Sequence, residues 1–175
     1  MGDAVPRRSA LLLGPLSAIS ALLLTVAMPQ PAQAYTQQHQ VTVERGASFC
    51  ARATAGIDHR VPGTLSGNQA WARAYALAGD CTTVHGARAR VRLEVQKWNA
   101  SRAAWEVCAA ASWVEGTTGR DQFGLTGPSV GLTYTPCGPG WRQTKAEAQS
   151  YRYVDSAGRF LWFGGTLYSG YEWVD

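Results

Sequence analysis

Three kinds of side chain in this sequence could support catalysis: a serine in a nucleophile-like motif, three histidines and several carboxylates. Residues 127–131, Gly-Pro-Ser-Val-Gly, place Ser129 in the G-x-S-x-G pattern of hydrolases. That motif needs a strand before the serine and a helix after it, and the histidine of such hydrolases follows later in the chain. Here a glycine-rich stretch precedes Ser129, a strand-like stretch follows it, and the last histidine is His85. The pattern therefore predicts a loop serine without a catalytic role.

The histidines and carboxylates give no catalytic or metal-binding pattern. His39, His59 and His85 are scattered through polar stretches, and neither a C-x-x-C pair nor a histidine at zinc-ligand spacing is present. Glycoside hydrolysis requires a pair of carboxylates, but the acidic residues occupy polar positions of alternating patterns or turns. These residues are Glu94, Glu106, Glu115, Asp121, Glu147 and Asp155. We expect them to be solvated surface charges, and we predict no enzyme activity, no metal and no cofactor.

The seven tryptophans are the residues with functional potential. A flat aromatic face can stack on a sugar ring or anchor a protein partner, whereas the alternative is that these rings fill the core. Trp105 and Trp113 share the alternation of Val107, so we expect them in the core. The candidate ligand-binding residues, expected to be exposed, are Trp98, Trp141 and Trp173.

The segment 87–115 is predicted to form a hairpin that positions several of these rings. Val91, Leu93 and Val95 alternate with polar residues, which is typical of a half-buried strand. A polar break follows at 99–102, and the alternation resumes over 105–113. The pattern predicts two antiparallel strands closed by Trp98 and Trp105. Because 101–113 is alanine-rich, a helix over that stretch is the alternative.

The rest of the chain also favours short strands. Strands are expected at 41–45, 48–54, 69–77 and 130–135, with a second hairpin around the turn at 155–158. Residues 69–77 also fit a short helix ended by Gly79. Residues 35–40 are polar and expected to be loose, and 56–67, with Pro62 and two glycines, are expected to form a surface loop.

Four cysteines, Cys50, Cys81, Cys108 and Cys137, indicate two disulfides in an exported chain. Three connectivities are possible, and sequence proximity favours Cys50–Cys81 and Cys108–Cys137. Together with the short strands, the cysteines predict an all-β fold: a disulfide-stapled antiparallel β-sandwich with at most one short helix. An immunoglobulin-like outline is one candidate arrangement.

The N-terminus has the pattern of a secretory signal peptide. Arg7 and Arg8 precede an apolar run at 10–28, and Ala-Gln-Ala at 32–34 is a small-residue cleavage site. The alternative is a retained membrane anchor. Cleavage of residues 1–34 would leave 35–175 as a single secreted domain with 14 basic and 11 acidic residues. That charge is too small to indicate nucleic acid or a membrane surface as a partner.

The leader, the hairpin at 91–105 and the segment Cys137-Gly138-Pro139-Gly140-Trp141-Arg142 resemble small secreted β-rich proteins of unassigned function from high-GC Gram-positive bacteria. The resemblance implies no catalytic residues. We therefore expect a secreted, non-enzymatic binding or cell-surface-associated module, with a polysaccharide or a secreted protein as its partner. The alternative is a protein inhibitor or effector that presents the disulfide-anchored turn at 137–141 or the turn at 155–158.

Overall fold

The computed structural model describes residues 35–59, 69–84, 86–133 and 137–174. The predicted signal peptide at 1–34, most of the predicted loop at 56–67, and His85 lie outside the described residues.

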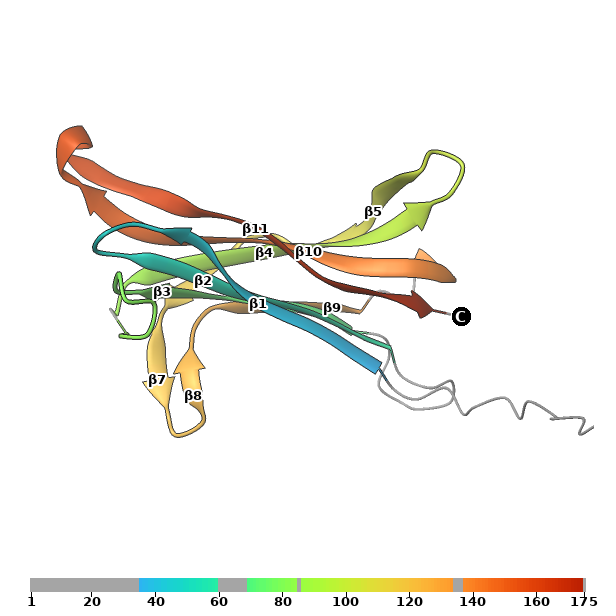
Figure 1. Cartoon of the computed structure of the whole chain (residues 1–175), viewed down its shortest axis with the longest axis horizontal. Helices are drawn as coiled ribbons and strands as arrows, with labels where there is room; N and C mark the ends of the chain where they lie inside the picture. The colour runs from blue at the N-terminus through green and yellow to red at the C-terminus, as the bar shows by residue number, and fades with distance from the viewer. Residues whose placement is uncertain (1–34, 60–68, 85, 134–136, 175) are drawn as a thin grey trace, which may run out of the picture. The chain divides into compact units, whose positions relative to one another are not determined.

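Two antiparallel sheets account for most of the described chain (Figure 1). The first sheet has the order β1 (Tyr35–Arg45), β2 (Cys50–His59), β3 (Gln69–Leu77) and β9 (Ser129–Thr133). The second has the order β11 (Arg159–Val174), β10 (Gly140–Val154), β4 (Arg88–Asn99) and β5 (Ala104–Ala110), and β6 (Val114–Thr117) also pairs with β4. A small hairpin joins β7 (Gly119–Asp121) to β8 (Gly124–Thr126). A single 3-10 turn, Asp155–Ala157, connects β10 to β11.

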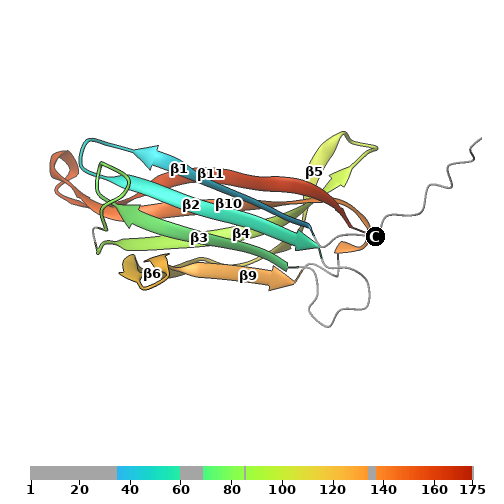
Figure 2. The ribbon, with the colours of Figure 1, turned by 60° about the horizontal axis from the view of Figure 1, so that its bottom comes forward.

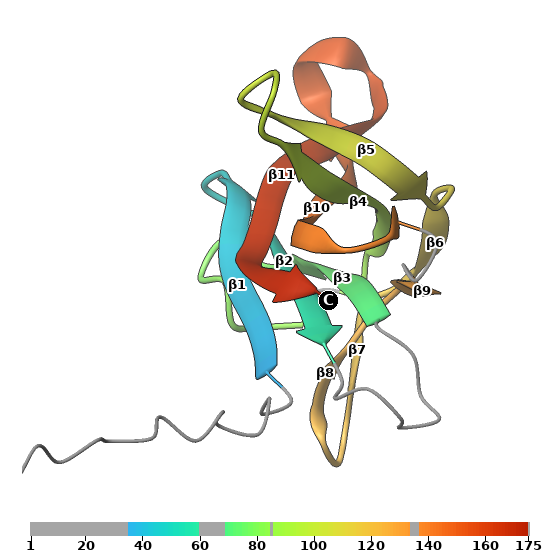
Figure 3. The ribbon, with the colours of Figure 1, turned by 90° about the vertical axis from the view of Figure 1, so that its right-hand side faces the viewer.

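The predicted all-β, disulfide-stapled sandwich is confirmed. Figure 2 shows the strands of both sheets running in similar directions, and Figure 3, viewed from one end, shows the two layers. The first three strands form a continuous meander before the chain crosses to the second sheet. An immunoglobulin domain instead keeps only its first two strands adjacent in one sheet, so this connectivity is different.

The layer between the sheets is built mainly from small side chains. The buried residues alternate along each strand with outward-facing ones, as a half-buried sheet requires. Nine alanines belong to this core: Ala53, Ala55, Ala70, Ala72, Ala74, Ala76, Ala89, Ala146 and Ala148. Larger members include Ile57, Val91, Leu93 and Leu167. Thr144 also donates a hydrogen bond across the core, from its hydroxyl to the carbonyl oxygen of Gly56 at 2.9 Å.

Both disulfides form in the pairing that sequence proximity favours. Cys50–Cys81 joins the start of β2 to the turn after β3, and Cys108–Cys137 joins β5 to the turn before β10. Each bridge therefore ties segments that belong to one sheet.

Most of the predicted strands agree with the structure, whereas the predictions of non-strand structure at 35–40 and 56–67 differ from it. Residues 101–113 contain strand β5 rather than a helix, and Gln69–Leu77 is strand β3. The expectation that 35–40 are loose is wrong, because the backbone there pairs with β2 up to the Tyr35–His59 position. The expected loop at 56–67 likewise begins later, after β2 ends at His59. In both places a partner strand supplies hydrogen bonds that the polar or glycine-containing sequence does not reveal.

Candidate functional site

None of the seven tryptophans lies in the core. The buried aromatic residues of the described chain are Phe49 and Tyr75, whereas Trp141 and Trp173 are 41% and 50% exposed. The other five tryptophans are partly exposed. The alternative that these rings fill the core is therefore wrong, and the tryptophans form part of the surface.

The core assignment of Trp105 fails because of a β-bulge. The pairing of β4 with β5 shifts between Val95 and Gln96, so that Val95 faces Ala109 and Gln96 faces Val107. Residues directly opposite each other share a face of the sheet. Ala109 accordingly packs on the core, while Val107 is 53% exposed and Trp105 lies on the outer face with it. Simple alternation along β5 cannot show such a change of face.

Trp113 lies on the same outer face. The guanidinium groups of Arg90 and Arg92 lie 4.4 and 5.0 Å from its ring centroid. The predicted core position of Trp113 is therefore also wrong, because the ring is covered by two cations of β4 and not by the first sheet.

The three predicted ligand-binding tryptophans converge at one end of the second sheet. Trp98 and Trp105 are cross-strand partners with ring centroids 5.5 Å apart. Trp141 and Trp173 are also cross-strand partners, at 5.6 Å, and Tyr171 lies 5.5 Å from Trp141. Figure 1 shows the β4–β5 hairpin, the start of β10 and the end of β11 at this end. We call these five residues the aromatic platform.

The platform borders an open hollow of about 290 Å³ lined by Trp98, Trp105, Trp141 and Tyr171. Two different hairpins thus contribute two rings each. Tyr171 and Trp105 are the members that sequence reasoning did not select. The density of aromatic residues near the C-terminus was a signal for Tyr171, whereas Trp105 required knowledge of the bulge.

The turn before β10 fixes Trp141 relative to β5. Arg142 is completely buried, and its guanidinium donates hydrogen bonds to the carbonyl oxygens of Cys137 at 2.6 Å and Pro139 at 3.1 Å. It also donates to the carbonyl of Trp141 at 2.9 Å. Because Cys137 is bonded to Cys108 of β5, the turn that leads into Trp141 is tied to the strand that carries Trp105. The Cys108–Cys137 disulfide thus covalently links the two segments that carry Trp105 and Trp141.

A pair of amides extends the platform along the sheet. Gln143 Nε2 donates to Gln96 Oε1 at 2.8 Å, and both side chains are 8% exposed. Together with Trp105 and Tyr168 they line a second hollow of about 390 Å³. Each amide carries two N–H donors and an oxygen with two lone pairs, so this single bond leaves further hydrogen-bonding capacity. The site therefore combines ring faces with amide groups.

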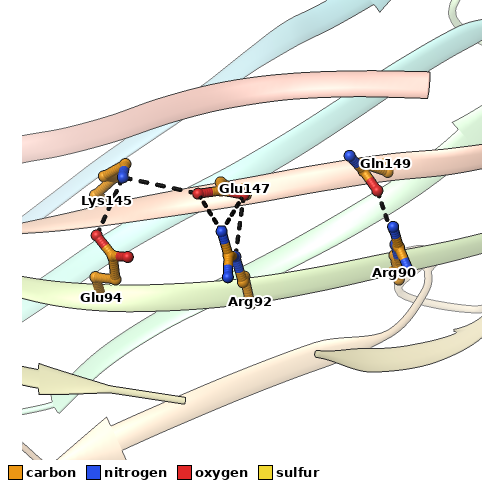
Figure 4. A network of polar contacts seen from close by, with 6 residues as sticks. All are labelled: Arg90, Arg92, Glu94, Lys145, Glu147 and Gln149. Carbon is orange, nitrogen blue, oxygen red and sulfur yellow. Dashed lines mark hydrogen bonds and ion pairs between the residues drawn. The ribbon is translucent and has the colours of Figure 1, made fainter. Parts of the chain in front are cut away.

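A row of ion pairs crosses the middle of the same face (Figure 4). Lys145 Nζ lies 3.1 Å from Glu94 and 3.7 Å from Glu147, and Arg92 donates to Glu147 at 2.7 Å. The hydrogen bond that Lys145 donates to the Glu94 carboxylate raises the pKa of Lys145. Each of these two carboxylates is therefore in an ion pair: Glu94 with Lys145, and Glu147 with both Lys145 and Arg92.

Neither Ser129 nor His39 shows a hydrolase-like arrangement. Ser129 begins β9 in the first sheet and pairs with Arg73, so no helix follows it. His39 Nδ1 lies 3.0 Å from the carbonyl oxygen of Tyr168. Within the described residues, no group of three or more histidines, cysteines or carboxylates could hold a metal ion.

Comparisons with known proteins identify no relative from which the role of this site could be inferred. The sequence matches no family model. No curated protein and no solved structure is significantly similar to it. In the part of the chain that the structure describes, no helix is long and apolar enough to cross a membrane.

Proposed function

We propose that this protein is a secreted, non-enzymatic binding module whose aromatic platform contacts a polysaccharide. The observation that carries the proposal is the convergence of Trp98, Trp105 and Trp141 around one hollow, outside an alanine-rich core. Ring faces of this kind stack on the apolar face of a sugar. The neighbouring amides of Gln96 and Gln143 can exchange hydrogen bonds with hydroxyl groups. An apolar site with a few convergent polar groups is the usual composition of a small-ligand site. Two disulfides are compatible with an extracellular location.

A second candidate is a module that binds another secreted protein. Exposed tryptophan and tyrosine clusters are also typical of the energetic centres of protein interfaces. The turn from Cys137 to Trp141, held by a disulfide and by Arg142, could be the presented element of an inhibitor or effector. Binding to a polymer in the absence of any other protein distinguishes the first candidate from the second.

The test is retention of the oxidised protein on insoluble chitin, cellulose, xylan and peptidoglycan, with tryptophan fluorescence recorded in parallel. We expect retention on one polymer, and Trp98→Ala and Trp141→Ala should each weaken it about tenfold or more, as for central interface residues. Trp141→Phe should retain part of the affinity because it keeps a flat ring. Trp71→Ala is the matched control, since Trp71 lies on the first sheet, packed over Gly56.

Retention on none of the four polymers would contradict the carbohydrate proposal and favour a protein partner. Equal losses for Trp141→Ala and Trp71→Ala would show that the platform is not the binding face.

A further inference from the structure

A further cavity lies at the other end of the sandwich from the platform. Its volume is about 350 Å³, within the range of small-molecule sites. Phe49 of the β1–β2 turn and Ala76 and Leu77 of β3 line it on one side, and residues 150–153 of β10 line it on the other. These last residues follow Trp141 by about ten positions along the same strand, so the cavity and the platform are separate sites.

Two polar groups of this cavity make no hydrogen bond within the described residues. Ser150 is 3% exposed, and its buried hydroxyl oxygen has no partner there. Arg152 Nε is also buried without a partner. Because buried polar groups in folded proteins are nearly always hydrogen-bonded, two such groups beside one cavity mark it as a candidate site for a polar ligand group.

Arg152 also brings a positive charge without a carboxylate beside it. Its guanidinium stacks against aromatic rings, 3.7 Å from the centroid of Phe49 and 4.3 Å from that of Phe163. No ion pair involves Arg152 among the described residues, whereas Arg88 and Arg92 of the same sheet each pair with a glutamate. The aromatic contacts orient the cation but leave its N–H donors available.

We infer that this cavity binds a small organic anion, a carboxylate on an apolar body. The guanidinium and the Ser150 hydroxyl would donate to the carboxylate, since arginine matches carboxylates with two parallel hydrogen bonds. Phe49, Ala76 and Leu77 provide the apolar wall for the body of the ligand. The inference does not depend on the polysaccharide proposal, because none of the residues that line this cavity belongs to the platform.

The test is an NMR titration of the oxidised, ¹⁵N-labelled protein with 2-naphthoate, octanoate and the neutral analogue 2-naphthylmethanol. We expect saturable shifts of the Arg152 Nε–H signal and of the 150–153 amides with a carboxylate, and about tenfold weaker binding of the alcohol. Comparing 2-naphthoate with octanoate distinguishes an aromatic from an aliphatic ligand.

Two variants separate binding from folding. Arg152→Met should weaken carboxylate binding about tenfold or more, while Arg73→Met, which removes the same charge from an exposed position of β3, should leave it unchanged. Ser150→Ala should weaken binding yet raise the melting temperature, because it removes a buried hydroxyl without a partner.

Absence of saturable shifts would overturn the inference and assign the polar groups to ordered water. Equal binding of acid and alcohol, or unchanged affinity in Arg152→Met, would also overturn it.

Discussion

Removing the Cys108–Cys137 disulfide should weaken the fold and loosen the aromatic platform together. The bridge closes a loop with a sequence separation of 29 residues. The chain-entropy relation then gives a stabilisation of about 3.6 kcal/mol at 25 °C. Cys108 is exposed, whereas Cys137 is 8% exposed and belongs to the main core, so Cys108→Ala with Cys137→Ala also loses some packing and the loop estimate is a lower limit. We expect a loss of at least this size in urea unfolding followed by far-ultraviolet circular dichroism.

The other disulfide is a matched control for this experiment. Cys50–Cys81 has a sequence separation of 31, so the same relation gives nearly the same loss. Cys50 is completely buried beside Tyr75 and Leu77, and its replacement by alanine adds the loss of packing. The Cys50→Ala, Cys81→Ala variant should therefore be at least as destabilised as the first variant.

The two variants should differ at the platform. Trp141 follows the turn that Cys137 anchors, whereas Cys50 begins β2 and Cys81 lies in the turn after β3. Only the Cys108 and Cys137 variant should change the near-ultraviolet dichroism of the edge-to-face tryptophan pairs and increase quenching by acrylamide under native conditions. A loss below about 1 kcal/mol, well under the usual range for a native disulfide, would refute the loop argument. An unchanged tryptophan spectrum would refute the claim that this bridge positions Trp141.

Two further predictions concern the stability of the fold outside the two proposed sites. Gly164→Ala should destabilise the protein by about 3 kcal/mol or more in urea unfolding, because a Cβ there overlaps the backbone of Ala148. Gly131→Ala, where a Cβ meets nothing nearer than 3.6 Å, should be close to neutral; similar losses would contradict this packing argument. Hydrogen bonds from the Thr83 hydroxyl and backbone lower the pKa of Asp80, so its contribution to stability is complete above about pH 4 and is lost as the pH falls towards the lowered pKa. The difference in urea midpoint between the wild type and Asp80→Asn should thus shrink in acid, and a difference that grows would contradict it.

The sequence alone was sufficient to predict an element when its hydrophobic pattern lies within a single strand. The alternation of Val91, Leu93 and Val95 with charged residues identified β4, its inner face and its end near Trp98. The disulfides followed from proximity because each pair joins segments of one sheet. Local patterning of this kind depends only on neighbours along the chain.

The arrangement of the site depends on register between strands, which the sequence does not show. The bulge opposite Val95 and Gln96 turned Trp105 outward, and the pairing of β10 with β4 placed Gln143 beside Gln96. A shift of one residue in either pairing would have moved these side chains to the opposite face. The surface positions of Trp98, Trp141 and Trp173 could be anticipated, but their convergence with Trp105 and Tyr171 could not.

The alanine-rich core explains how so many large rings come to lie outside. Alanines on β2, β3 and β10 leave little depth between the two sheets, so an indole on an inner face would force them apart. A ring on the outer face, however, gains only part of the roughly 1.5–3 kcal/mol that full burial of a large apolar side chain provides. Tyr171 and Trp173 remain 63% and 50% exposed, so the folded chain alone leaves much of that free energy unrealised. A ligand lying across the platform would cover this surface, and that gain in apolar burial is the physical basis of the proposed binding role.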